Sequence, residues 1–330
     1  MSLVNIGVLG CASIACRSVI PAIINSKNQY VLSGIASRTK EKAEKFASIF
    51  NTNSYHNYET LINNTEINAV YIPLPNSLHA KWVEKALSKN LHVLVEKSMG
   101  CSYEEVNYLN KLAKEKGLVL VENFMFRFHS QLSIINKLVG KKRIGELRCV
   151  RSSFGFTPFS ENDNIRYKKE LGGGALFDAG AYPIKIMQHF LGEDIQITSA
   201  NLYYDKDKGV DIWGGAYLKQ NNGPLFGEIS FGFDNFYQCN LELWGSEGKI
   251  YTNRIFTAPP DYSPEIIIES ANGNDKICVD PCNHFERILS HFFKLIKTNK
   301  GLEAEYAQNI SQARLIQEAR KISSEENKNY

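Results

Sequence analysis

The sequence predicts an α/β domain followed by an α+β domain with a large, mainly antiparallel open sheet. Short apolar runs alternate with segments of helical periodicity through about the first 120 residues. After about residue 145, strand-like runs instead follow one another, with turn sequences between them. The length of 330 residues also exceeds that of one typical domain. We therefore expect two domains, at residues 1–123 and 124–330.

The first half is predicted to consist of parallel βαβ units. Apolar runs of strand length occupy residues 4–9, 30–36, 69–72, 91–95 and 118–121. Between them, apolar residues recur with helical spacing at residues 13–25, 39–50, 77–89 and 103–116. Strands and helices that alternate with short connections form a doubly wound parallel sheet.

The second half has the pattern of an antiparallel sheet. Turn sequences such as Asn221-Asn222-Gly223-Pro224 separate several of its strand-like runs. The predicted strands are residues 147–156, 195–204, 214–219, 225–233, 237–244, 249–253 and 265–269. The predicted helices are residues 129–140, 180–191, 283–298 and 303–323, and the polar residues 324–330 are expected to form a frayed tail.

Composition excludes several classes of function. The net charge is only +3 and forms no basic stripe, so we expect no nucleic-acid partner. No apolar run approaches the roughly 20 residues of a membrane span, and we see no signal peptide. The seven cysteines are scattered and odd in number, which is typical of reduced thiols in a cytoplasmic protein. Cys278, Cys282 and His284 have no second pair with ligand spacing nearby, so we expect no metal.

A glycine-containing turn joins the first predicted strand to the first predicted helix. Gly10, Ala12 and Ala15 stand at the three positions of a G-x-G-x-x-G/A pattern, with alanine replacing the middle glycine. Gly10 would allow the tight turn, and Ala12 would let the backbone approach a pyrophosphate. Ser13 and Ile14 open the helix, whose N-terminus attracts phosphate charge. The pattern predicts a dinucleotide-binding Rossmann domain, and a turn without a ligand is the alternative.

The residues after the second predicted strand, Ser37 and Arg38, bear on the choice of dinucleotide. Sites that prefer NAD usually carry Asp or Glu here for the ribose 2′-hydroxyl, but the first acid in this chain is Glu41. An arginine can instead pair with a 2′-phosphate and stack on adenine. We therefore expect NADP(H) to be preferred over NAD(H), with a solvated surface Arg38 as the alternative.

Three later segments carry further candidates. In open parallel sheets, loops at the carboxyl ends of the strands line the ligand crevice. Two of the segments follow predicted strands of the first domain, and the third opens a predicted helix after the glycine run at residues 172–174. The candidates in these segments are Pro73, Leu74, Asn76, His79, Glu96, Lys97, Asp178 and Tyr182.

Together these motifs resemble those of the Gfo/Idh/MocA oxidoreductase family over nearly the whole chain. The resemblance rests on the Gly10 turn, Pro75-Asn76-x-x-His79, Glu96-Lys97, Glu122-Asn123, the triple glycine and Asp178-x-Gly180. It implies a cofactor site that includes Pro73, Leu74, Asn76, His79, Glu96, Lys97 and Asn123.

Two departures narrow the resemblance. Ser98 replaces the proline of a common Glu-Lys-Pro motif, while Tyr182 and Lys185 replace the His and the final Asp of Asp-x-Gly-x-His-x-x-Asp. A tyrosine followed by Pro183 is similar to the branch of sugar-nucleotide 3-ketoreductases, xylose dehydrogenases and dihydrodiol dehydrogenases. Residues 244–248 and 253–260 look closest to the dTDP-sugar C-3 ketoreductases of deoxysugar pathways.

That branch implies a role for each catalytic candidate. Tyr182 would be the general acid that protonates the developing alkoxide. Lys97 would anchor the nicotinamide ribose and polarise the carbonyl, and its charge would lower the pKa of the phenol. Asp178 would orient either Lys97 or the substrate. A core tyrosine with a satisfied hydroxyl is the alternative for Tyr182.

A sugar diphosphate would also need cationic contacts. The candidates are Arg166, Tyr167, Asn253 and Arg254 for phosphates and base, and Arg127 and His129 for the shape of the pocket. For each of them, a place in a surface ion pair is an equal alternative.

We expect NADPH-dependent reduction of a keto group, at C-3, on a nucleotide-linked deoxysugar. The first alternative is an NADP-dependent dehydrogenase for a free aldose or a dihydrodiol. The second is a dinucleotide-binding sensor without turnover, which Ser98 and Lys185 keep open and the intact Lys97 and Tyr182 oppose. The exposed face of the second sheet, together with the resemblance, implies a homodimer or homotetramer with no membrane partner.

Overall fold

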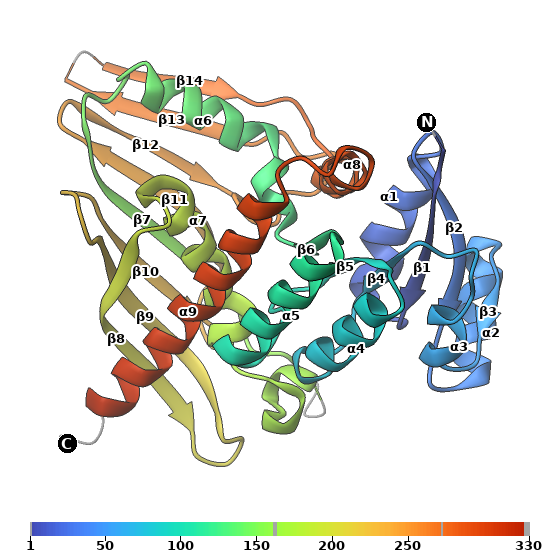
Figure 1. The fold of residues 1–330 in the computed structure, drawn as a ribbon. Coiled ribbons are helices and arrows are strands. Elements are labelled where there is room, and N and C mark those ends of the chain that lie inside the picture. Colours follow the sequence, from blue (N-terminus) through green and yellow to red (C-terminus); the bar gives the residue numbers. More distant parts are fainter. Residues whose placement is uncertain (1, 161–163, 272, 327–330) are drawn as a thin grey trace. The chain divides into compact units, whose positions relative to one another are not determined.

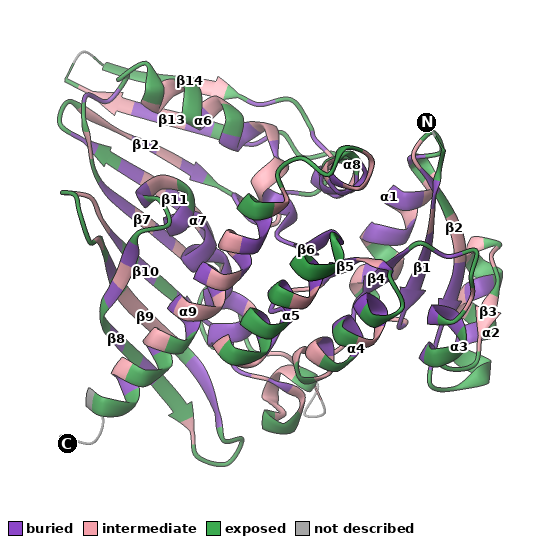
Figure 2. Ribbon diagram, in the orientation of Figure 1, coloured by how far each residue is buried: buried purple, intermediate pink, exposed green. Residues whose placement is uncertain are grey.

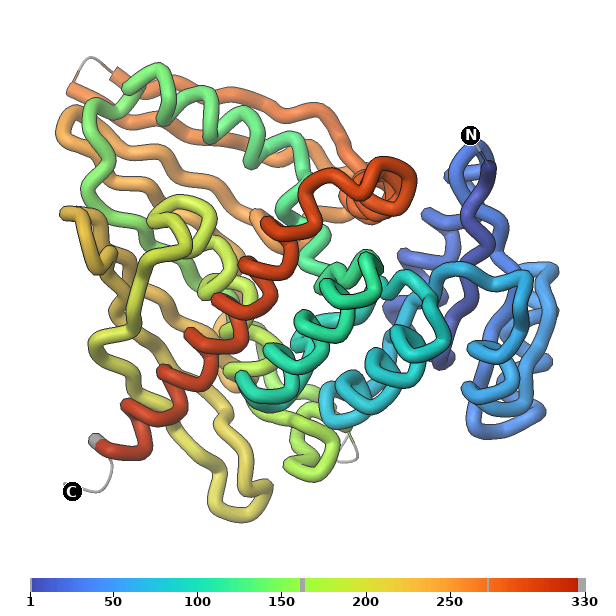
Figure 3. The backbone as a smooth tube through the Cα atoms, viewed as in Figure 1, coloured from blue at the N-terminus to red at the C-terminus, as the bar shows by residue number. Residues whose placement is uncertain are grey.

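A computed structural model describes residues 2–160, 164–271 and 273–326 of the chain (Figures 1 and 3). The chain forms two compact units. The first contains the chain up to Asn123 together with Phe285–Ile310, and the second contains Phe124–His284 and the chain from Ser311 onward. The division after Asn123 coincides with the predicted boundary. Residues 285–310 differ from the prediction, because they pack with the first unit although they follow the second in sequence.

The first unit is built on a six-stranded sheet in the order β3-β2-β1-β4-β5-β6. All of its strand pairs are parallel, which confirms the predicted Rossmann sheet. The strand order reverses between β1 and β4, and ligands bind at such a switch point in open α/β sheets. The strands are β1 (Val4–Leu9), β2 (Tyr30–Ala36), β3 (Ser54–Tyr55), β4 (Ala69–Ile72), β5 (His92–Val95) and β6 (Leu120–Glu122).

The helices between these strands lie within a few residues of the predicted ranges. A π-helical turn, Ala15–Val19, precedes the first of them. They are α1 (Ile20–Asn25), α2 (Lys40–Phe50), α4 (Asn76–Ser88) and α5 (Tyr103–Lys116). Strand β3 and helix α3 (Tyr58–Ile62) were not predicted, because two and five residues are too short to show a periodicity.

Two C-terminal helices supply the late residues of the first unit. They are α8 (His284–Thr298) and α9 (Leu302–Glu326). The Tyr30 hydroxyl donates to the Leu289 carbonyl oxygen at 2.6 Å, and the Tyr306 hydroxyl donates to the Leu118 carbonyl oxygen at 2.5 Å. Helix α9 continues to Glu326, so residues 324–326 are helical and not the frayed tail we predicted; residues 327–330 lie outside the described residues.

The second unit contains an eight-stranded sheet in the order β14-β13-β12-β11-β7-β10-β9-β8. Only β7 and β10 pair in parallel, which confirms the predicted mainly antiparallel sheet. The unpredicted edge strand β14 is polar throughout most of its length. The strands are β7 (Leu147–Gly155), β8 (Ile195–Asp205), β9 (Val210–Gln220), β10 (Phe226–Gly232), β11 (Gln238–Gly245), β12 (Gly248–Asn253), β13 (Glu265–Ser270) and β14 (Gly273–Cys278).

One face of this sheet, the inner face, is covered by helices (Figure 1). Helices α6 (Ser130–Gly140) and α7 (Ala181–Leu191) and the later part of α9 lie against it. A Cβ on Gly227 of β10 would lie 2.3 Å from the sulfur of Met187 on α7, so this glycine makes room for the helix. The Thr252 hydroxyl of β12 donates to Gln131 of α6 at 3.2 Å.

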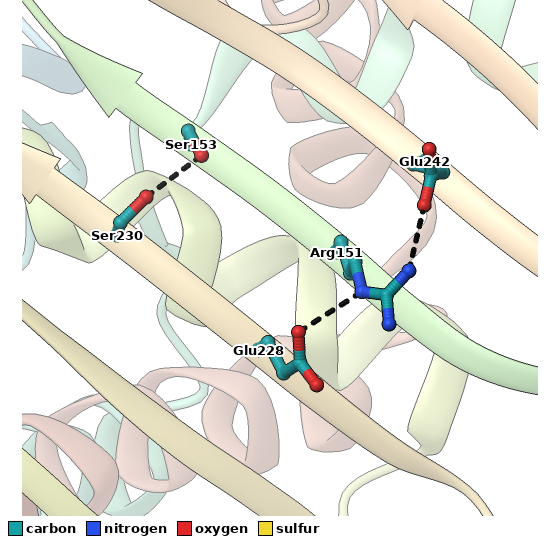
Figure 4. A network of polar contacts seen from close by, with 5 residues as sticks. All are labelled: Arg151, Ser153, Glu228, Ser230 and Glu242. Carbon is teal, nitrogen blue, oxygen red and sulfur yellow. Dashed lines mark hydrogen bonds and ion pairs between the residues drawn. The ribbon is translucent and has the colours of Figure 1, made fainter.

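The opposite face, the outer face, carries polar and aromatic side chains. Figure 4 shows Arg151 of β7 between Glu228 of β10 and Glu242 of β11, at 2.9 and 3.0 Å. The side chains of Ser153 and Ser230 hydrogen-bond beside them at 2.7 Å. Along the strands, exposed residues of this face alternate with buried residues of the inner face (Figure 2).

Four strand ends of the second sheet meet at one edge, which we call the loop end. Gly155 of β7 pairs with Gly232 of β10 and with Gln238 of β11, and Asn240 pairs with Asn253 of β12. The segments after β7, β10 and β12 therefore leave the sheet from the same end. This placement brings residues 233–237 and 254–262 near the segment that follows Gly155.

Candidate active site

The glycine turn of the first unit has the conformation that the motif requires. Gly10 has φ +127°, a region that favours glycine, and its N–H donates to the Ala36 carbonyl oxygen at 2.9 Å. A Cβ at this position would lie 2.9 Å from the Leu74 side chain and 3.4 Å from the Pro73 oxygen. The turn therefore lies directly against the loop after β4, where the strand order reverses.

The segment after this turn begins a helix, as the motif predicts. Helical structure starts at Ser13 and Ile14, one residue after Ala12, and leads into the π-helical turn. Ala15 is fully buried, which agrees with close packing of the helix on the sheet. A helix N-terminus at this point of the sheet presents backbone N–H groups to an anion, so the turn fits a dinucleotide pyrophosphate.

Ser37 and Arg38 follow β2 and differ in exposure. Ser37 is buried, and its hydroxyl accepts a hydrogen bond from the Thr39 N–H at 3.4 Å. Arg38 is exposed and forms no ion pair with any carboxylate of the described residues. Its charge lies close enough to Tyr58 to oppose the rise that burial causes in the pKa of that phenol. Arg38 is thus an available cation at the predicted position of the 2′-phosphate.

His79 connects two loops of the first unit. Its Nδ1 lies 2.7 Å from the Ser98 carbonyl oxygen, and its Nε2 lies 2.7 Å from the Leu74 carbonyl oxygen. Burial lowers the pKa of His79 to about 4, so the ring is neutral at pH 7 and donates to one of these oxygens. Its polar atoms face the backbone, so its effect on a cofactor would come through the loop that contains Pro73, Leu74 and Asn76.

Glu96 and Asn123, both predicted to bind cofactor, contact each other. The Asn123 side-chain amide donates to Glu96 Oε1 at 2.5 Å, and the Tyr71 hydroxyl donates to the same oxygen at 2.6 Å. Burial raises the pKa of Glu96, and these hydrogen bonds and the charge of Lys97 oppose that rise. Glu96 therefore joins the ends of β4, β5 and β6.

Contacts of the neighbouring residues fix the backbone on both sides of Lys97. Glu96 precedes it, and the Lys97–Ser98 peptide bond is cis. On the other side, the Ser98 carbonyl contacts His79, and the Met99 N–H donates to Glu122 at 2.8 Å. The Lys97 side chain is only partly buried. Its backbone is therefore anchored at the carboxyl edge of the sheet.

Tyr182 lies at the start of α7 in the second unit. Four phenylalanine rings surround it with ring-centroid distances of 5.1 to 5.9 Å. Lys185, one turn along the helix, is buried, and its Nζ lies 5.4 Å from the centre of the Phe124 ring. We call Tyr182 and the four phenylalanine rings around it the aromatic cluster. Its rings are Phe124, Phe126, Phe154, Phe256 and Tyr182. A phenol in such a cluster has a fixed ring orientation.

Asp178 is paired with Arg166 within the second unit. Arg166 Nε lies 2.5 Å from Asp178 Oδ2, and the carboxylate raises the pKa of the guanidinium. Gly173 permits this approach, because a Cβ there would lie 2.5 Å from the Arg166 carbonyl oxygen. The structure thus joins two residues that the sequence suggested for different roles, orientation and phosphate binding.

Asp211 of β9 was not predicted as part of the site. It is buried and accepts a hydrogen bond from the Leu176 N–H at 2.5 Å, where the helical segment that carries Asp178 and Tyr182 begins. Gly174 has φ +116°, and a Cβ there would lie 2.3 Å from Asp211 Oδ1. Asp211 precedes the predicted strand of residues 214–219, and no motif in the sequence marks it.

Three of the residues predicted to bind substrate make contacts with other residues of the second unit. The Tyr167 hydroxyl accepts from the Phe159 N–H at 3.2 Å. His129 is buried, and its Nδ1 accepts from the Gln131 N–H at the start of α6. The Arg127 guanidinium lies 5.3 Å from the centre of the Phe128 ring. Their contacts to a substrate stay predictions.

Asn253 and Arg254 line a cavity of about 380 Å³ at the loop end. Sequence reasoning missed its aromatic walls, because they come from separate segments that only the sheet brings together. The other lining residues are Phe236, Tyr237, Gln238, Cys239, Tyr251 and Tyr262.

Residues 2–160, 164–271 and 273–326 contain no group of three or more His, Cys, Asp or Glu side chains arranged to hold a metal ion. None of the helices in these ranges is long and apolar enough to cross a bilayer.

Comparison with known proteins agrees with this geometry. Residues 4–124 match the oxidoreductase family with an NAD-binding Rossmann fold (GFO_IDH_MocA), and residues 133–251 match the GFO/IDH/MocA C-terminal domain. A dTDP-3,4-didehydro-2,6-dideoxy-alpha-D-glucose 3-reductase of Saccharopolyspora spinosa is 36% identical over 96% of this chain and 94% of the relative. A D-xylose 1-dehydrogenase (NADP(+)) of Haloferax volcanii is 30% identical over 94% of each chain.

A solved structure shows the same fold. KijD10, a 3-ketoreductase of Actinomadura kijaniata in complex with NADP and TDP-benzene, is 32% identical and superposes with a TM-score of 0.93, covering 97% of this chain and 98% of that chain. Sequence and structure thus agree over both units. The chain belongs to the Gfo/Idh/MocA oxidoreductase family.

Proposed function

We propose that this protein uses NADPH to reduce a keto group, at C-3, of a nucleotide-linked deoxysugar. The observation that carries the proposal is the near full-length similarity to a dTDP-sugar 3-reductase, combined with a buried tyrosine in an aromatic cluster. The solved 3-ketoreductase with NADP and TDP-benzene supports the same cofactor and substrate class.

The reaction adds a hydride to the carbon atom and a proton to the oxygen atom of one C=O bond. When bound, reduced nicotinamide supplies the hydride to the carbonyl carbon. The Tyr182 phenol donates its proton to the carbonyl oxygen as negative charge develops there, and it regains a proton from solvent afterwards. The Lys97 ammonium polarises the carbonyl and stabilises the alkoxide and the phenolate. The aromatic cluster limits the orientations of the Tyr182 ring and so favours transfer.

A second candidate reaction is the reverse direction on a free sugar. The relative from Haloferax volcanii, named as a D-xylose dehydrogenase that uses NADP(+), favours it. The same Tyr182 and Lys97 would then remove a proton from a hydroxyl group. We favour the ketoreductase because the dTDP-sugar reductase has the higher identity, 36% against 30%.

The cofactor preference follows from the residues after β2. The exposed guanidinium of Arg38 pairs with no carboxylate among the residues that the structure describes. It and the hydroxyl of Ser37 suit a 2′-phosphate, since neither offers an acceptor carboxylate to a ribose 2′-hydroxyl. We infer a reducing, cytoplasmic setting from the seven cysteines, all of which are free thiols.

We also infer that the outer face of the second sheet pairs with a second copy of the chain. Tyr203 and Trp213 stack there with centroids 3.8 Å apart, and Tyr217 is also exposed. Contiguous exposed aromatic surface is typical of interfaces. Arg151 is already paired with two glutamates, so burial would not leave its guanidinium unpaired. Because a two-fold interface uses the same patch twice, a homodimer or a tetramer built from such dimers results.

Replacing Tyr182 by Phe tests the proton donor. Tyr182→Phe keeps the ring in the aromatic cluster and removes only the hydroxyl, so kcat with a dTDP-linked 3-ketosugar and NADPH should fall about 10²-fold or more. Tyr30→Phe, which also removes a buried hydroxyl, is the matched control and should keep wild-type kcat. Equal kcat values for Tyr182→Phe and the wild type would refute the assignment.

Replacing Arg38 tests the cofactor preference. Arg38→Ala should weaken NADPH binding about 10- to 100-fold, because a charge-assisted contact to phosphate is lost, and should change NADH binding little. The dissociation constants are measured by fluorescence titration, with the exposed Arg148→Ala as a control that leaves both unchanged. Equal losses for the two cofactors would exclude a 2′-phosphate contact.

Introducing a charge by substitution tests whether the outer face forms the interface of the oligomer. Tyr217→Glu places a carboxylate opposite Glu228 and should shift the protein to a smaller species in light scattering after size exclusion. Ile49→Glu adds the same charge at an exposed position of α2 in the first unit and should leave the mass unchanged. If Tyr217→Glu keeps the wild-type mass, the interface lies elsewhere.

A further inference from the structure

The backbone of Arg166 is fixed beside the glycine run that leads to Tyr182. Arg166 lies in the short 3₁₀ turn Ile165–Tyr167, and its N–H donates to the Asn164 side-chain oxygen at 3.1 Å. Its carbonyl oxygen accepts from the Gly174 N–H at 2.9 Å. These contacts hold the start of the arginine side chain in one place.

The guanidinium of Arg166 is held on two sides. Its Nε donates to Asp178 Oδ2 at 2.5 Å, and its Cζ lies 4.7 Å from the centre of the Phe159 ring. The side chains of Arg166 and Asp178 are 37% and 17% exposed, so the pair is only partly in water. Charges in such a position interact more strongly than charges on an open surface.

Asp178 brings this guanidinium close to the phenol of Tyr182. The π-helical turn Leu176–Gly180 continues directly into α7, which begins at Ala181. Side chains four residues apart are neighbours on the surface of a helix. Asp178 and Tyr182 therefore lie on the same side of one helical segment, and the partner of the aspartate lies near the tyrosine.

The charges confirm that Arg166 and Tyr182 lie within electrostatic reach of each other. The carboxylate of Asp178 raises the pKa of Arg166 against the effect of burial, and the negative charges that Tyr182 and Tyr167 gain on ionisation raise it further. An electrostatic interaction is mutual. The guanidinium therefore also stabilises the phenolate form of Tyr182.

The other groups around Tyr182 differ in charge. The phenylalanine rings of the aromatic cluster carry none. Lys185 of α7 is a second cation, with its Nζ 5.4 Å from the Phe124 ring centre, and Lys97 is a third in the proposed reaction. Asp178 is an anion beside the phenol and would oppose its ionisation. Arg166 compensates that charge through their ion pair.

We propose that Arg166 is a positioning residue of the proposed reaction. Its guanidinium, held by Asp178, stabilises the negative charge on the Tyr182 oxygen as the proton leaves. In this step the O–H bond of Tyr182 breaks and an O–H bond forms on the substrate, which receives its hydride from NADPH. The phenolate keeps the charge until water returns a proton. The proposal rests on the proposed function, since it concerns the proton donor of that reaction.

The pH at which Tyr182 ionises tests this contact without any substrate. It is measured by NMR of the full chain with ring-labelled tyrosine, where the Tyr182 signal is identified by its loss in Tyr182→Phe. Arg166→Gln removes the cation and leaves the Asp178 carboxylate, so the pKa of Tyr182 should rise by about one unit. Asp178→Asn removes the carboxylate and leaves the cation, so the pKa should fall.

Two further variants control for the fold. Arg166→Lys keeps the charge and should keep most of the wild-type pKa of Tyr182. Arg148→Gln removes one exposed arginine elsewhere in the second unit and should leave that pKa unchanged. A loosened fold would move the pKa of Tyr182 in the same direction in Arg166→Gln and Asp178→Asn, so opposite shifts identify an electrostatic effect. Circular dichroism checks that each variant is folded.

Kinetics with a dTDP-linked 3-ketosugar and NADPH separate this role from binding of a substrate phosphate. A weaker acid at Tyr182 donates its proton more slowly, so Arg166→Gln should lower kcat about 3- to 10-fold and leave KM nearly unchanged. Arg166→Lys should recover most of kcat.

The outcomes distinguish the proposal from the proposed function. Opposite shifts of the Tyr182 pKa, together with the loss in kcat, support the proposal. The same pKa in Arg166→Gln and the wild type overturns it even if the protein reduces the ketosugar. A raised KM at unchanged kcat also overturns it and assigns Arg166 to the substrate. If the wild type reduces no nucleotide-linked ketosugar, the proposed function fails, and the role of Arg166 in proton donation fails with it.

Discussion

A half-buried glutamate joins three strand ends at the edge of the first unit that carries Lys97, a proposed catalytic residue. Glu96 lies at the end of β5 and accepts hydrogen bonds from Tyr71 of β4 and from Asn123 after β6. A buried charge is costly unless it is hydrogen-bonded, so this residue makes the three strand ends depend on one another. Lys97 is the next residue in the chain. Its backbone position, and with it any role in polarising a carbonyl, depends on that network.

In the second unit, two aspartates play the same part as Glu96, because each holds a neighbouring segment through a polar contact. Asp178 pairs with Arg166, and Asp211 accepts the Leu176 N–H where the Tyr182-bearing segment begins. In each unit, acidic side chains hold the segment that carries a proposed catalytic residue, Lys97 or Tyr182. Glycines make these contacts possible: Gly173 and Gly174 both stand where a Cβ would collide with the paired groups. Two glycines of the triple glycine, Gly173 and Gly174, are therefore required by the packing of this segment.

Sequence patterns were sufficient for most of the regular elements and insufficient for the contacts. Strands such as β1 and β4 were predicted at their observed bounds, since their apolar runs end at turns. The edge strand β14 is polar and gave no periodicity. The amphipathic helix α8 was predicted, but amphipathicity does not say which core a helix covers, and the segment from Phe285 joins the first unit. Likewise the candidates Asn253 and Arg254 were identified, whereas Tyr237 and Tyr262 meet them only through strand pairing.

The central claim is that this member of the family reduces a nucleotide-linked ketosugar. Mass spectrometry of the product formed from a dTDP-linked 3-keto-deoxysugar and NADPH deuterated at the transferable position tests it most directly. The account predicts a product that carries one deuterium at C-3. An unchanged ketosugar, together with reduction of NADP⁺ by free xylose or a dihydrodiol, would contradict it.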